Sequence, residues 1–65
     1  MNNNQIISFI SENPNFTNVE IIYQDDSCKC MTPTQAIITL QQMAINDRLR
    51  MNCSLFKNTI LIYLQ

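Results

Sequence analysis

The chain has 65 residues, of which 46% are hydrophobic, and its four Lys and Arg against five Asp and Glu give a net charge of −1. This length favours one globular domain over residues 1–65, and the apolar fraction is too high for a disordered chain. The sequence contains neither histidine nor glycine, which removes the commonest general base and the glycine-rich loops that hold phosphates. We therefore expect a protein that is not an enzyme.

The distribution of apolar residues and cysteines bears on the compartment. No apolar run approaches the roughly 18 residues of a membrane span, and "MNNNQ" places no basic residue before the first apolar patch, unlike a secretory signal. In a protein that is not exported, three cysteines are most simply reduced thiols. We expect an intracellular protein that does not contact a membrane.

The segment "NQIISFISENP" predicts a short first helix. Ile6, Phe9 and Ile10 have the i, i+3, i+4 spacing of one helical face. Asn13-Pro14 ends it, because the residue before a proline disfavours helical geometry.

The next segment, "NFTNVEIIYQDD", fits two structures. Thr17 and Glu20 match a capping box, and Phe16 and Ile21 match a hydrophobic staple, so we predict a short second helix. The alternation of β-branched residues in "VEIIYQ" favours a strand instead, and this interpretation is kept as the alternative.

The segment "TPTQAIITLQQMAIND" predicts the longest helix, over residues 33–46. Thr32 is its cap, Pro33 occupies the first helical position, and Gln35 completes a capping box. At about 100° per residue, one face is expected in the core. Its residues are Ala36, Ile37, Leu40, Met43 and Ala44.

The last segment, "RLRMNCSLFKNTILIYLQ", changes to a period of two residues. This alternation, interrupted by the polar pair Lys57-Asn58, predicts a β-hairpin over residues 48–64.

Three helices followed by a β-hairpin resemble the winged helix-turn-helix superfamily, an α+β fold, on the segments "IISFISENP", "FTNVEII" and "TPTQAIITLQQMAINDRLRM". Within it the chain looks most like the C-terminal winged-helix domain of the middle subunit of replication protein A and its telomeric relatives. The resemblance implies a module that docks a protein partner in a nuclear DNA replication, telomere or repair assembly. The strand alternative gives the order α-β-α-β-β and a small inhibitor-like protein.

The outward face of the helix over residues 33–46 is the expected partner-binding surface. Two isoleucines on this face suit a protein interface, or a homodimer, better than a DNA groove. The residues of the surface are Thr34, Gln35, Ile38, Gln41, Gln42 and Ile45.

The alternative function is a DNA-binding transcriptional regulator. The same helix would read bases through its glutamines, and the hairpin over residues 48–64 would contact phosphates through Arg48, Arg50 and Lys57. Three cations would give weak, salt-sensitive binding.

A third possible function is a metal- or redox-sensing module built on Cys28 and Cys30. With Cys53 they supply three thiolates, whereas structural zinc takes four ligands and no histidine is present to complete the set. We therefore expect no metal and no cofactor, with Cys53 packed in the core of a strand.

Overall fold

Two helices and four strands make up the part of the chain that the structure, a computed structural model, describes: residues 1–44, 48–54 and 56–64. In chain order the elements are α1 (Asn3–Glu12), β1 (Asn18–Ile22), β2 (Cys28–Met31), α2 (Pro33–Gln41), β3 (Leu49–Ser54) and β4 (Thr59–Leu64).

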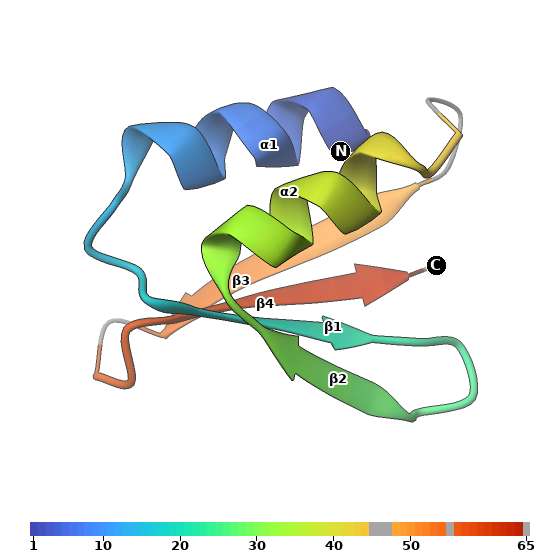
Figure 1. Ribbon diagram of the computed structural model, residues 1–65. Helices are drawn as coiled ribbons and strands as arrows, with labels where there is room; N and C mark the ends of the chain where they lie inside the picture. The colour runs from blue at the N-terminus through green and yellow to red at the C-terminus, as the bar shows by residue number, and fades with distance from the viewer. Residues whose placement is uncertain (45–47, 55, 65) are drawn as a thin grey trace.

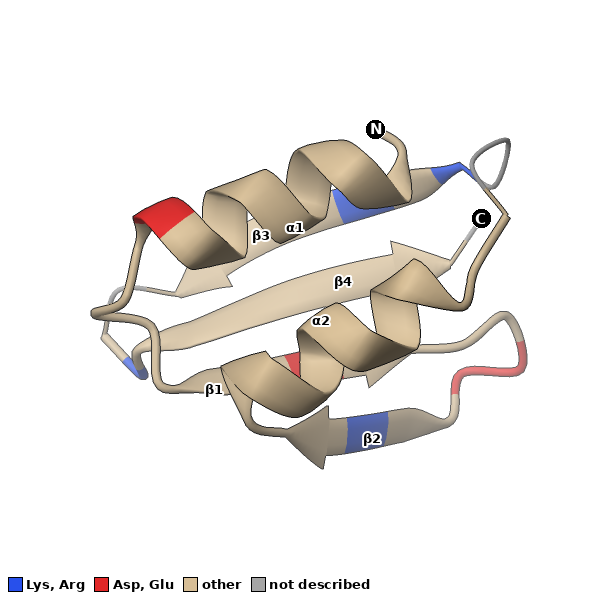
Figure 2. Ribbon diagram, turned by 45° about the horizontal axis from the view of Figure 1, so that its top comes forward, with Lys and Arg blue, Asp and Glu red and all other residues tan. Residues whose placement is uncertain are grey.

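The four strands form one mixed sheet in the order β2-β1-β4-β3. The hairpins β1–β2 and β3–β4 are antiparallel, whereas β1 and β4 pair in parallel at the centre. The edge strands β2 and β3 therefore run in the same direction, and α2 crosses from one edge to the other (Figure 1). Both helices lie on the same face of the sheet (Figures 1 and 2). Neither α1 nor α2 has the length and apolar character needed to cross a membrane.

The predicted winged helix is wrong, because the described residues form two helices and a four-stranded mixed sheet rather than three helices followed by a hairpin. The alternative prediction, the order α-β-α-β-β, includes the strand β1 but omits the strand β2. The hairpin over residues 48–64 is present as β3 and β4, but β4 also pairs with β1 and so is not a free wing.

The second predicted helix, which began at Thr17, is a strand for a long-range reason. The amides of Thr17 and Asn18 both donate to the carbonyl of Asn58, at the start of β4. Val19 and Ile21 are fully buried, and β1 has a paired neighbour on each side. These contacts outweigh a local capping signal, since most helical stability in proteins comes from tertiary packing.

The two helices begin close to where the sequence places them. The capping box at α2 is confirmed: the Gln35 amide donates to Thr32 Oγ1 at 3.3 Å, and Gln35 Oε1 accepts from the Thr32 amide at 3.5 Å. The helix ends at Gln41 rather than running to residue 46, and residues 45–47 lie outside the described part. Of the expected core face of α2, Ala36 and Leu40 are buried, whereas Ala44 is exposed.

The core lies between the helices and the inner face of the sheet. Within the described part of the chain, ten buried side chains make it up: Ile6, Ile10, Phe16, Val19, Ile21, Ala36, Leu40, Leu49, Ile60 and Ile62. One buried polar side chain joins the helices at its margin, because Asn3 Nδ2 donates to the carbonyls of Leu40 and Met43, each at 3.0 Å.

Among the described residues, two turn positions have positive φ, although the chain has no glycine. They are Asp26 (66°) in the β1–β2 turn and Asn58 (51°) just before β4. Asp and Asn are among the residues that tolerate the left-handed region best. In the β1–β2 turn, the Tyr23 amide donates to the Ser27 carbonyl at 2.8 Å.

Candidate docking groove

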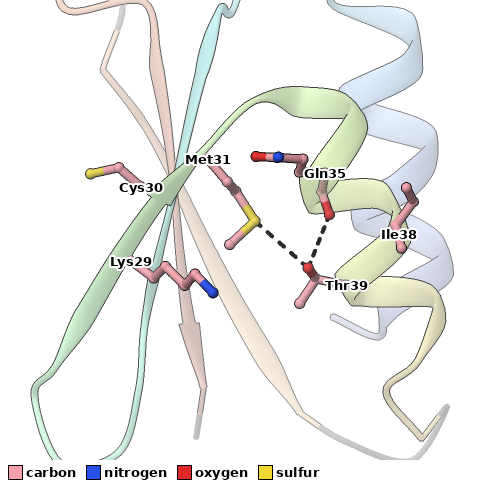
Figure 3. A pocket seen from close by; sticks show the side chains of 6 residues that line it. All are labelled: Lys29, Cys30, Met31, Gln35, Ile38 and Thr39. Carbon is pink, nitrogen blue, oxygen red and sulfur yellow. Dashed lines mark hydrogen bonds between the residues drawn. The ribbon is translucent and has the colours of Figure 1, made fainter.

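A groove of about 280 Å³ lies between the edge strand β2 and helix α2 (Figure 3). Its lining residues come from both elements: Lys29, Cys30, Met31, Gln35, Ile38 and Thr39. Figure 3 shows Lys29 and Met31 extending toward the helix, whereas Cys30 points away from it. This follows from the alternation of side chains along a strand.

The lining of the groove is partly apolar and partly polar. Met31 is half-buried against the core, and Ile38 is 52% exposed on α2. Thr39 Oγ1 lies 2.9 Å from the Gln35 carbonyl and 3.8 Å from the sulfur of Met31, so it can donate to either. Gln35 and Lys29 are exposed and supply polar groups to the same lining.

The strand beside the groove has one unpaired backbone edge in the described structure, since β2 pairs there only with β1. In an antiparallel ladder, hydrogen-bonded pairs of residues alternate with pairs that are not hydrogen-bonded. The Tyr23 amide donates to the Ser27 carbonyl, so Tyr23 and Ser27 form a hydrogen-bonded pair. It follows from the register that the backbone groups of Lys29 and Met31 bond to β1, whereas those of Cys28 and Cys30 point outward. These two residues offer two amides and two carbonyls at the free edge.

The other edge strand is partly covered. The N-terminal amine of Met1 donates to the Leu49 carbonyl at 2.9 Å, and the Leu49 amide donates to the Met1 carbonyl at 2.8 Å. The outward amide and carbonyl of Leu49, at the start of β3, are therefore both hydrogen-bonded. The edge that lies beside the groove is β2, and the outward amides and carbonyls of its residues Cys28 and Cys30 are available to a partner.

The predicted partner-binding surface is only partly brought together. Gln35 and Ile38 line the groove. Thr34 and Gln41 of α2 and Gln42, which follows it, are exposed but do not line the groove. Ile45 lies outside the described residues. The sequence did not assign Lys29, Cys30, Met31 or Thr39 to the partner-binding surface. Three of these four lie in "SCKCM", which has no apolar alternation that marks a strand.

The predicted phosphate-contacting residues do not form a patch. Arg48 precedes β3, Arg50 lies within it, and Lys57 is in the following turn; all three are exposed. Arg50 stacks on the ring of Tyr63, with its guanidinium carbon 4.5 Å from the ring centroid. Figure 2 shows charged residues of both signs scattered over the fold.

The cysteines do not assemble with other ligand types in the described residues, which contain no group of three His, Cys, Asp or Glu side chains suited to a metal ion. Cys28, Cys30 and Cys53 are all free and exposed. The expectation that Cys53 is a core residue is wrong. The Cys28 thiol hydrogen-bonds to Glu20, and this bond, together with the charge of Glu20, raises the pKa of Cys28.

No protein-family model, curated protein or solved structure matches this chain.

Proposed function

We propose that the chain is a non-enzymatic interaction module that docks an extended segment of a partner protein at the β2 edge. The observation that supports this most is the free backbone edge of Cys28 and Cys30 lying directly beside the groove. An extended peptide added to a sheet edge gains affinity from main-chain hydrogen bonds and specificity from side-chain pockets. In this chain the free edge of β2 would supply the main-chain hydrogen bonds, and the groove would supply the side-chain pocket.

The magnitudes suit a regulated, moderate interaction. Four backbone groups give up to four hydrogen bonds, each worth about 0.5–1.5 kcal/mol net. An apolar side chain buried in the groove, against its apolar lining residues Met31 and Ile38, adds about 1.5–3 kcal/mol. After the cost of ordering the peptide, binding in the micromolar range is expected.

The replication, telomere or repair setting depended on the winged-helix resemblance, which the observed element order contradicts. The DNA-binding alternative has less support than docking, since the length of β3 separates Arg48 from Lys57 and a phosphate-binding protein needs clustered cations.

The test is selection of short random peptides displayed on phage, followed by affinity measurement of the enriched peptides. Cys30→Pro removes the outward amide without removing a bond to β1, because proline is tolerated on an edge strand. We expect it to weaken binding at least tenfold, and Ile38→Asp to do the same by placing a charge in the groove.

Two matched controls separate docking from damage to the fold. Cys30→Ser keeps the amide, and Gln41→Asp adds the same charge on an exposed position of α2 outside the groove. Both should bind like the unmodified chain. If the enriched peptides bind Cys30→Pro and Ile38→Asp as tightly as the controls, docking at this edge is refuted.

A further inference from the structure

The second face of the sheet has no helix over it in the described structure, since α1 and α2 both cover the opposite face (Figures 1 and 2). The side chains that alternate with the buried residues of each strand project from this open face. On the central strands they include Glu20 and Ile22 of β1 and Leu61 and Tyr63 of β4. On the edge strands they include Cys28 and Cys30 of β2 and Arg50 and Asn52 of β3.

The centre of the open face is apolar. Ile22 is the register partner of Tyr63, and Leu61 lies next to Tyr63 on the same face. All three are half-exposed and do not belong to the core or to the side chains packed against it. Because they are half-exposed on a face that neither α1 nor α2 covers, a covering partner would remove further apolar area from water (Figure 1).

One acid and one base flank this apolar centre. Glu20 is the register partner of Leu61, on one side of β4, and Arg50 is the partner of Tyr63, on the other side. From the spacing of strands and the rise per residue, their Cα atoms lie about 12 Å apart across the face. The guanidinium carbon of Arg50 lies 4.5 Å from the centroid of the Tyr63 ring, and a guanidinium over an aromatic ring still has N–H groups that can bind a carboxylate.

We infer that this open face binds a second copy of the chain. In this dimer the open faces of two sheets lie against each other, and a twofold axis runs between them. The axis is perpendicular to the line from Glu20 to Arg50 and passes over its midpoint. This arrangement places each Glu20 opposite the Arg50 of the other copy. Both ion pairs form around one shared apolar centre, as the self-complementary patch of a twofold dimer requires.

The charge of the face favours this occupant over an anionic one. A nucleic acid or an acidic membrane surface needs several clustered cations, whereas Glu20 cancels Arg50 here. This surface is distinct from the β2 groove, since α2 lies on the other side of the sheet (Figure 1).

The area of the face sets the concentration at which the dimer forms. Four strands about 4.8 Å apart and about five residues long give a flat area of roughly 300 Å² per copy. Roughly 600 Å² for the pair is below the 1,200 Å² or more of standard stable interfaces. The dimer is therefore weak, and its dissociation constant lies in the range of about 10 μM to 1 mM.

Sedimentation equilibrium over that concentration range, with a charge-exchange cycle, tests the dimer. Each of the single variants Arg50→Glu and Glu20→Arg replaces both intermolecular ion pairs of the dimer with a pair of like charges. Each should therefore raise the dissociation constant of the dimer about tenfold or more. The double variant carrying both changes restores opposite charges and should return to within about threefold of the unmodified chain. Lys57→Glu makes the same charge change in the exposed β3–β4 turn and should leave association unchanged.

Rescue by the double variant cannot arise from damage to the fold. A chain that stays monomeric at about 1 mM, or a double variant that associates no better than the two single variants, would overturn the inference. Peptide binding at the β2 groove is measured separately, so failure of one surface does not imply failure of the other.

Discussion

Asn3 joins the two helices, and its replacement by alanine is the sharpest test of how this small core is held together. Asn3 is 5% exposed, and its Nδ2 donates to the carbonyls of Leu40 and Met43, each at 3.0 Å. These carbonyls lie near the C-terminal end of α2, where backbone acceptors lose their intrahelical partners. The Asn3 side chain therefore supplies a hydrogen-bond donor to the carbonyls at the end of α2, which lie partly within the core.

The expected loss follows from these two bonds. Each contributes about 1 kcal/mol net, and the Leu40 carbonyl keeps a second donor, the Met43 amide at 3.1 Å. The higher helix propensity of alanine returns about 0.5 kcal/mol, so Asn3→Ala should lose about 1.5 kcal/mol of unfolding free energy. For a domain of this size, 1 kcal/mol corresponds to about 4–8 °C, and the melting temperature should fall by about 6–12 °C.

Thermal unfolding followed by circular dichroism measures this, with Asn4→Ala as the matched control. Asn4 lies in the same helical turn, but its side chain is exposed, so its loss should change stability by no more than about 0.5 kcal/mol. If Asn3→Ala and Asn4→Ala melt at the same temperature, the bonds to α2 do not stabilise the fold and the reasoning fails.

Three further predictions concern local hydrogen bonds. Thr32→Ala removes the α2 cap and should cost about 1 kcal/mol by denaturant unfolding; an unchanged midpoint would contradict the cap. Hydrogen bonds from Ser27 hold the pKa of Asp25 below its ordinary value of 3.8, so they add stability above that pH that is lost as the pH falls through the lowered pKa. Ser27→Ala should therefore lose less stability on acidification than the unmodified chain, and parallel curves would refute this. Because Glu20 raises the pKa of Cys28, Glu20→Gln should speed alkylation of Cys28 at about pH 8 in a chain whose other cysteines are serine; an equal rate would exclude the contact.

The helices were predictable because their signals are local. Thr32, Pro33 and Gln35 define the start of α2 within four consecutive residues. The same pattern was available at the N-terminus, where Asn2 and Gln5 form a capping box that sequence analysis overlooked in the asparagine-rich start. Capping chemistry depends on a few neighbouring residues, so a sequence states it directly.

The topology was not predictable from local signals. Strand β1 depends on parallel pairing with β4 at the other end of the chain, and no pattern near Thr17 reports that pairing. Strand β2 is harder still, because Cys28, Lys29 and Cys30 are all exposed and an exposed edge strand needs no alternation of apolar residues. Predicting a helix in place of β1 reduced the mixed sheet to a hairpin. Missing β2 removed the groove from the predicted site, although Gln35 and Ile38 were identified on the helix that forms its other wall.

The two proposed surfaces have a joint consequence, because they lie on opposite sides of one sheet. A dimer through the open face leaves both β2 edges and both grooves uncovered, so it presents two peptide-binding sites. A target with two suitable segments on one flexible chain would bind this dimer with an effective concentration for the second site in the millimolar range. Because the dimer itself dissociates at about 10 μM to 1 mM, such a target should bind more tightly than a single-segment peptide by up to about a hundredfold where the linker spans the sites. Arg50→Glu should abolish that gain while leaving the single-segment affinity unchanged, and surface plasmon resonance with the dimeric chain in solution and each peptide immobilised at low density measures both. An equal gain with Arg50→Glu would show that the avidity does not come from the open face.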